Sequence, residues 1–189
     1  MGLNNWFDKG ITPDTYIESL DRHKESFAHI YKHFKMPADE EFFQSLKEEN
    51  LRVIVLAEVW CGHCMLNIPI LLRLAEKVDM PVRFLPRDEN LELMDQYLTN
   101  GKSRTIPIFI FIDENGNEVT KWGPIAEKTK QFVDQHRVDL PSKDAEDYKE
   151  KFTNLIKLMT KTFREDSAFW DGAFNSMKQV LADRLKVNK

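Results

Sequence analysis

The sequence predicts an α/β protein in which a four-stranded mixed sheet is flanked by helices. Between about residue 37 and residue 137, short runs rich in β-branched and aromatic residues alternate with stretches whose apolar residues recur at helical spacing. The last two runs are separated by the turn-forming residues 113–116, which favours an antiparallel hairpin. The expected order is therefore helix, strand, helix, strand, helix, strand, strand, helix.

Residues 1–36 are expected to add a helical extension to this unit. Thr12 can serve as an N-cap and Pro13 as the first helical residue, and apolar residues then recur at helical spacing to about His33. This predicts one long helix. Residues 1–11 are short and mixed, with Trp6 and Phe7 as candidate docking residues. The histidines of this segment, predicted to be surface or packing residues, are His23, His29 and His33.

The central unit, residues 37–137, begins with a helix from Pro37 to about Glu48. A buried strand from Arg52 to Val59 leads into a helix that starts at Cys61 and ends near Val78. The remaining elements expected here are a strand at 82–85, a helix capped by Asp88 or Asn90 and ending at Tyr97, strands at 106–112 and 117–122, and a helix at 126–137.

The apolar spacing within residues 138–189 predicts two more helices that pack on the same domain. Leu140-Pro141 marks the boundary, and Ser142 is expected to cap the first helix, whose apolar stripe continues to Phe163. The second begins near Ser167. Such aromatic stripes are more often core than interface, because a lone domain must bury them.

Composition excludes some function classes. The 189 residues carry a net charge of −4, so no excess of Lys and Arg is present to neutralise phosphates, which argues against a nucleic-acid binder. No secretory leader and no apolar run of about 20 residues is evident, so neither secretion nor a membrane partner is expected. We expect a cytoplasmic protein, in which closely spaced cysteines point to catalysis or sensing.

The two cysteines of the chain, Cys61 and Cys64, lie where the strand ends and the helix begins. Unpaired N–H groups and the helix dipole favour an anion there, and such settings lower a cysteine pKa from about 8.5 to roughly 3.5–7.5. Cys61 is therefore the candidate nucleophile. Core packing and half of a zinc site are the alternatives, but a structural zinc needs four ligands and no second cysteine pair is present. No metal or other cofactor is expected.

The arrangement resembles the thioredoxin family over residues 37–137. The residues that carry the resemblance are Trp60-Cys61-Gly62-His63-Cys64, Pro69 five residues later, Thr105-Ile106-Pro107, Asn115-Gly116 and Gly123. The resemblance implies a thioredoxin-like fold and a cis peptide bond before Pro107. It also implies that a substrate strand adds beside the backbone of Ile106, with Pro107, Trp60 and Trp122 as further substrate-binding residues.

Two departures from thioredoxin concern redox tuning. Gly62-His63 resembles the active site of protein disulfide isomerases, and a histidine near the thiolate would stabilise the reduced form. Thioredoxin has a potential of about −270 mV and protein disulfide isomerase of about −180 mV, so we expect a potential above that of thioredoxin. The buried acid that the family carries six residues before the first cysteine is Val55 here. Glu58 is the nearby acid, expected either to reach the site or to be solvated or ion-paired.

The resemblance implies a thiol–disulfide oxidoreductase. Cys61 would attack a disulfide of a client protein or of a low-molecular-weight compound, and Cys64 would resolve the mixed disulfide. A thiol or reductase electron donor is the second implied partner. The alternative is a redox-sensing or protein-interaction module with little turnover, in which the helical extensions form a docking surface.

Overall fold

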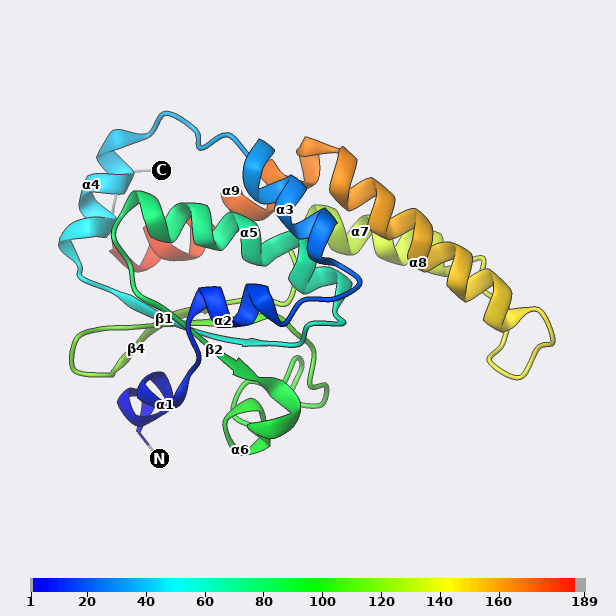
Figure 1. The fold of residues 1–189 in the computed structure, drawn as a ribbon, viewed down its shortest axis with the longest axis horizontal. Helices are drawn as coiled ribbons and strands as arrows, with labels where there is room; N and C mark the ends of the chain where they lie inside the picture. The colour runs from blue at the N-terminus through cyan, green and yellow to red at the C-terminus, as the bar shows by residue number, and fades with distance from the viewer. Residues whose placement is uncertain (1, 186–189) are drawn as a thin grey trace.

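The structure, a computed structural model, describes residues 2–185 and contains a four-stranded sheet of order β2-β1-β3-β4 (Figure 1). Its strands are β1 (Arg52–Ala57), β2 (Val82–Pro86), β3 (Ile108–Ile112) and β4 (Glu118–Trp122). β1 pairs parallel with β2 and antiparallel with β3, and β3 pairs antiparallel with β4. The predicted mixed sheet and its hairpin are confirmed.

The two central strands form the core of the molecule. Every residue of β3 is buried, as is β1 from Val53 to Ala57. Such unbroken apolar runs are typical of strands covered on both faces, whereas a strand with one wet face alternates polar and apolar residues. In the register, Val55 lies between Phe84 of β2 and Phe109 of β3. The buried sheet therefore gives a rigid base for the loop that follows β1.

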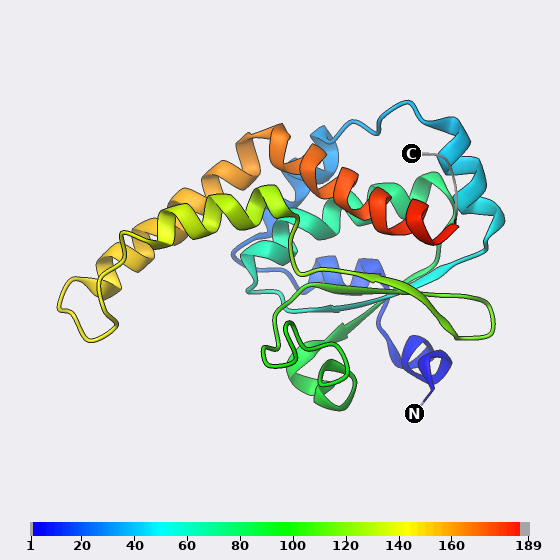
Figure 2. The same cartoon turned by 180° about the vertical axis from the view of Figure 1, so that it is seen from behind.

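Helices pack on both sides of this sheet. The helices are α1 (Leu3–Lys9), α2 (Pro13–Glu18), α3 (Lys24–His33), α4 (Glu40–Glu48), α5 (Gly62–Lys77), η1 (Arg87–Glu89), α6 (Leu91–Met94), α7 (Glu127–Arg137), α8 (Tyr148–Glu165) and α9 (Ser167–Leu185). α3, α5 and α9 lie on one side, and α1 and α6 lie on the other (Figures 1 and 2). α2 packs against β2 at the edge of the sheet.

The N-terminal extension differs from its prediction in two ways. Residues 3–9 form a helix that was not expected, and Trp6 and Phe7 are buried, so their assignment as docking residues is wrong. The single long helix is instead two helices, because α2 packs against β2 whereas α3 packs against α5. The Ser19 hydroxyl donates to the carbonyl of Tyr16 at the break, an interaction that competes with helical hydrogen bonding.

Several boundaries inside the chain also moved. α4 begins at Glu40 rather than Pro37, because the Asp39 carboxylate caps it by accepting from the N–H of Phe42. The helix expected to run from residue 88 or 90 to Tyr97 is only η1 and the four-residue α6. α8 begins at Tyr148, so the helix start expected at Ser142 is wrong.

The C-terminal extension has two parts with different surroundings. α9 returns onto α5, α7 and β4 and closes the core. α7 and α8 run side by side and project from the body of the molecule as an arm, whose tip is the loop between them (Figures 1 and 2). The inner end of α8 contacts α3 and α5, which carries the two cysteines at its start. The arm therefore stands next to the cysteine pair.

Candidate functional site

Cys61 is the N-cap residue of α5. Its sulfur accepts a hydrogen bond from the backbone N–H of Cys64 at 3.3 Å, as a serine or aspartate oxygen does at this position. A hydrogen bond from the Cys64 thiol lowers the pKa of Cys61 most, followed by backbone N–H groups of Cys64 and His63 and the charge of Arg87. Burial opposes them, but the net pKa lies below the ordinary thiol value. Cys61 therefore ionises more readily than an ordinary cysteine.

Cys64 lies one helical turn further and is the less accessible thiol. Its relative exposure is 1 %, against 7 % for Cys61. Burial raises the pKa of Cys64 well above the ordinary value, and its hydrogen bond to Cys61 and the negative charge of that sulfur raise it further. The two thiols therefore differ in the way a nucleophile and a resolving residue must differ.

The loop before β3 lies against Cys61. The Ile106–Pro107 peptide bond is cis, as predicted, and the Cys61 thiol donates to the carbonyl of Ile106 at 3.6 Å. A second cis bond, Gly123–Pro124, was not predicted. The backbone of Ile106 thus lies next to the reactive sulfur, although its side chain is buried.

His63 occupies a more enclosed position than the sequence suggested. Its ring packs 6.1 Å from that of Phe163 on α8, and its buried Nδ1 has no hydrogen-bond partner. Burial and, to a smaller extent, the positive charge of Arg137 lower the pKa of His63 to about 4. With this pKa the imidazole is neutral at pH 7, so any stabilisation of the thiolate by residue 63 does not come from a positive charge on its ring. Residue 63 acts on Cys61 through its backbone N–H, whose hydrogen bond helps to lower the pKa of the Cys61 thiol.

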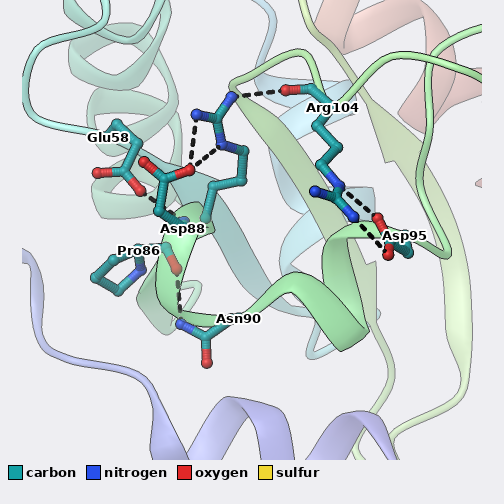
Figure 3. Close-up of polar contacts among 7 residues, drawn as sticks. Glu58, Pro86, Asp88, Asn90, Asp95 and Arg104 are labelled. Carbon is teal, nitrogen blue, oxygen red and sulfur yellow. Dashed lines mark hydrogen bonds and ion pairs between the residues drawn. The ribbon is translucent and has the colours of Figure 1, made fainter.

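Glu58, which follows the last residue of β1, points toward η1 (Figure 3). Its carboxylate accepts from the backbone N–H of Asp88 at 2.8 Å. The same turn is held by Asn90, whose side chain donates to the Pro86 carbonyl at 2.7 Å. The charge of Glu58 raises the pKa of Cys64, whereas a backbone hydrogen bond from Glu58 lowers it. The Glu58 carboxylate is thus hydrogen-bonded to the backbone of the neighbouring turn, a position that was not foreseen from the sequence.

Trp60 and Gly62 line the accessible side of the site. The Trp60 ring is 47 % exposed, and the guanidinium of Arg87 lies 5.2 Å from its centre. A ring nitrogen of His23, which is buried, lies 3.2 Å from the Trp60 carbonyl oxygen. A Cβ on Gly62 would meet open space. Trp60 therefore offers an exposed ring next to Cys61.

Trp122 requires a correction. It was expected to bind substrate, but its side chain is buried and stacks on Phe109 of β3. Its indole N–H donates to the Ser176 hydroxyl of α9 at 2.9 Å. The C-terminal helix covers this ring, which the resemblance to the family could not show because the extension lies outside it.

Tyr16 is a neighbour of the site that the sequence did not single out. It is buried, stacks on Phe84 with ring centres 4.3 Å apart, and its hydroxyl donates to the Glu58 carbonyl at 3.5 Å. Burial raises its pKa, and the charges of Cys64, Cys61 and Glu58 raise it further, so the phenol stays protonated. In the sequence it was one residue of an apolar helical stripe, and no local signal distinguished it.

A groove of about 400 Å³ opens beside Cys61 between the cysteine loop and α8. Its other lining residues are Arg22, His23, Trp60, Gly62, His63, Arg137, Phe152, Ile156, Met159, Thr160 and Phe163. Within residues 2–185, no group of three or more His, Cys, Asp and Glu side chains is placed to hold a metal ion. The geometry fits an extended chain that places its sulfur on Cys61.

Two solved structures share this fold over nearly the whole chain. An HIV epitope scaffold superposes with a TM-score of 0.63 at 16 % identity, covering 99 % of this chain and 97 % of the scaffold. A Pseudomonas aeruginosa protein of unknown function superposes with a TM-score of 0.62 at 16 % identity, covering 92 % and 99 % of the two chains. At such identity the likeness concerns the fold. None of the curated proteins matches this chain.

The family comparison concerns most of the chain and includes the site. A family model described as Thioredoxin matches residues 10–138, a range that contains both cysteines, the cis-proline loop and the whole sheet. The match extends beyond the N-terminal limit expected from the sequence, since it includes α2 and α3. With the sheet order and the cysteine pair at the start of α5, this chain belongs to the thioredoxin family.

Proposed function

We propose that this protein is a thiol–disulfide oxidoreductase with Cys61 as the nucleophile and Cys64 as the resolving residue. The observation that carries the proposal is the asymmetry of the two thiols. Cys61 caps α5 and has a lowered pKa, whereas Cys64 is buried beneath it and has a raised pKa. A structural cysteine pair has no need of such a difference.

The proposed reaction has two displacements. The Cys61 thiolate attacks one sulfur of a client disulfide, so that a mixed disulfide forms and the other client sulfur leaves as a thiolate. The buried Cys64 thiol loses its proton and attacks the Cys61 sulfur, which releases the first client sulfur and forms the Cys61–Cys64 disulfide. The client gains two electrons, and an external dithiol or reductase returns them to the protein.

The potential that we propose lies above that of thioredoxin, as in a disulfide isomerase-type site. The backbone N–H of His63 supports this proposal, because it helps to lower the pKa of Cys61, and a proline at this position would lack the donor. Stabilising the thiolate of the reduced form makes the disulfide a stronger oxidant. The uncharged ring of His63 plays no part in this argument.

We further propose that the protein works in a reducing compartment such as the cytoplasm. The two cysteines of the chain are both used by the site, which suits a compartment in which structural disulfides are rare. Among residues 2–185, no helix combines the length and the apolar character needed to span a membrane.

A second candidate function is a redox-sensing interaction module with little turnover. The observation in its favour is the apolar surface on α8, where Phe152, Ile156 and Leu158 are exposed by 37 %, 42 % and 43 %. In such a module, binding of a partner to the arm would change with the redox state of Cys61, and no client disulfide would be reduced catalytically.

Reduction of insulin by dithiothreitol distinguishes the two functions. We expect the wild-type protein to accelerate precipitation of the insulin chains, and the Cys61→Ser variant to leave the rate at that of dithiothreitol alone, because a hydroxyl does not attack a disulfide. Circular dichroism of the variant controls for folding. A wild-type protein that fails to accelerate the reaction, or a variant that remains as active, would refute the oxidoreductase.

A further inference from the structure

One wall of the groove beside Cys61 is formed by α8, which lies outside the residues that the family model matches. The opposite wall is the cysteine loop with Trp60. A groove between the Cys61 sulfur and an added helix is placed to select clients, because a chain that enters this groove to reach Cys61 lies against that helix. This position makes α8 a candidate specificity element of the proposed oxidoreductase.

The groove is mainly apolar, and part of that surface is open to solvent. Met159 and Phe163 of α8 are buried on its inner side, whereas Ile156 and Phe152, one and two turns before Met159 on the same helix face, remain exposed. The exposed ring of Trp60 lies across from them. Large exposed apolar side chains that surround a reactive group are typical of a binding site. A client with a large apolar side chain near its disulfide would cover them.

The charge around the groove is positive, although the whole chain is negative. Arg22 and Arg137 line the groove, and neither guanidinium has a hydrogen-bond or ion-pair partner among residues 2–185. α8 itself carries five Lys or Arg residues and two Glu residues, in a chain whose net charge is −4. Unpaired arginines favour carboxylates as ligands, because a guanidinium binds them in a bidentate manner.

We propose that this groove binds an acidic segment of a client protein in which a large apolar residue is adjacent to the disulfide cysteine. The apolar residue packs between Trp60 and Ile156, and carboxylates of the segment pair with Arg137 and Arg22. The proposal rests on the proposed function, since it assigns the client class of the same site. Of the two kinds of disulfide expected from the sequence, it selects proteins over small molecules.

Three peptide disulfides test the preference. Each is a fluorogenic hexapeptide with a central cysteine, flanked by Glu and Leu in the first, by Lys and Leu in the second, and by Gln and Ser in the third. We expect kcat/KM of the wild type to be at least about tenfold higher for the Glu-Leu peptide than for the Gln-Ser peptide, with the Lys-Leu peptide between them. Equal values for the three peptides would overturn the proposal.

Matched variants on the arm locate the effect. Ile156→Ser should reduce the ratio of kcat/KM for the Leu-containing peptides over the Ser-containing peptide to below about three. Arg137→Gln should reduce the ratio of kcat/KM for the Glu-Leu peptide over the Lys-Leu peptide to below about three. Leu158→Ser is the control for Ile156→Ser and Lys149→Gln the control for Arg137→Gln, because both control residues are exposed on α8 in the same arm but do not line the groove. Controls that weaken the preferences as much as the groove variants would show a general effect of α8 and would overturn the assignment.

A binding measurement separates this proposal from the proposed function. Fluorescence anisotropy is recorded for the same labelled peptides with serine in place of cysteine, which need no thiol chemistry. Preferential binding of the Glu-Leu peptide without reduction of any disulfide would refute the oxidoreductase and leave the groove assigned. Reduction of bis(2-hydroxyethyl) disulfide together with equal binding of all peptides would refute the groove and leave the chemistry standing.

Two other occupants would be detected by further outcomes. Dimerisation in sedimentation experiments that Ile156→Ser abolishes would assign the groove to a second copy of this chain. Binding to anionic phosphatidylserine vesicles that the same variant loses would assign it to a membrane surface. Either outcome overturns the proposal of a client segment.

Discussion

The Cys64→Ser variant is expected to stop after the first displacement and to accumulate as a mixed disulfide with its client. Cys61 keeps its position at the start of α5, and the serine hydroxyl can still donate to its sulfur, so attack on the client disulfide proceeds. The resolving thiol is missing, so the complex persists until an external thiol cleaves it. Mass spectrometry of the variant with oxidised insulin, without added thiol, measures the adduct.

The expected loss of turnover is at least about 100-fold. Well-oriented intramolecular groups reach effective concentrations of about 10⁵–10⁸ M, which millimolar external thiol cannot replace. Wild type and Cys61→Ser are the controls, and neither should yield a stable adduct. If Cys64→Ser turned over insulin like the wild type, Cys64 would not be the resolving residue, and a mechanism with a single cysteine would be required.

Gly123→Ala is expected to lower the free energy of unfolding by about 2–6 kcal/mol, which is a large part of the stability of a typical domain. The φ angle of Gly123 is +130°, a region that residues with a Cβ rarely adopt. An added Cβ would lie 2.2 Å from the Pro107 carbonyl oxygen and 3.2 Å from the Ile108 Cα. The substitution therefore strains its own backbone and displaces the loop beside Cys61.

Gly101→Ala is the matched control for that variant. Its φ angle is +67°, but nothing lies within 4 Å of an added Cβ, so only the backbone penalty of about 1–2 kcal/mol is expected. Urea denaturation followed by circular dichroism gives both free energies. Should Gly123→Ala cost no more than Gly101→Ala, the close approach between residue 123 and the proline loop would not exist in solution.

The parts of this molecule that sequence reasoning could predict are those with local signals. Alternation of strand-like and helix-like runs, with turn residues at 113–116, led to the correct mixed sheet. Cys61 and Cys64 were predictable at the start of a helix because the strand ends and the helical stripe begins around them. The cis bond before Pro107 followed from the resemblance to the family.

What the sequence missed depends on contacts between distant segments. His63 was expected near the thiolate, but the sequence did not show that its ring would pack against Phe163, a hundred residues later, or that burial would lower its pKa. Trp122 was expected to face the client, but α9 folds over it and binds its indole N–H. The groove combines α8 with the cysteine loop, and no local pattern shows which helix face will meet that loop.

The N-terminal helices show the same limit. Apolar spacing across residues 13–33 is continuous, so it predicted one helix. The structure divides it, because Tyr16 packs on Phe84 of the sheet edge whereas Phe27 and Ile30 lie on the helix that packs against α5. Periodicity describes which residues are buried, and tertiary packing decides where the axis must turn.

The difference in ionisation between the two thiols is the central claim, and alkylation of the reduced protein by iodoacetamide across a pH series tests it most directly. Peptide mapping by mass spectrometry assigns the label to each cysteine. Because the pKa of Cys61 is lowered and that of Cys64 is raised, Cys61 should be labelled first, with its rate half-maximal below the ordinary thiol pKa of about 8.5, while Cys64 stays unlabelled. Equal labelling of both cysteines, or a half-maximal rate of Cys61 at or above that value, would contradict the claim.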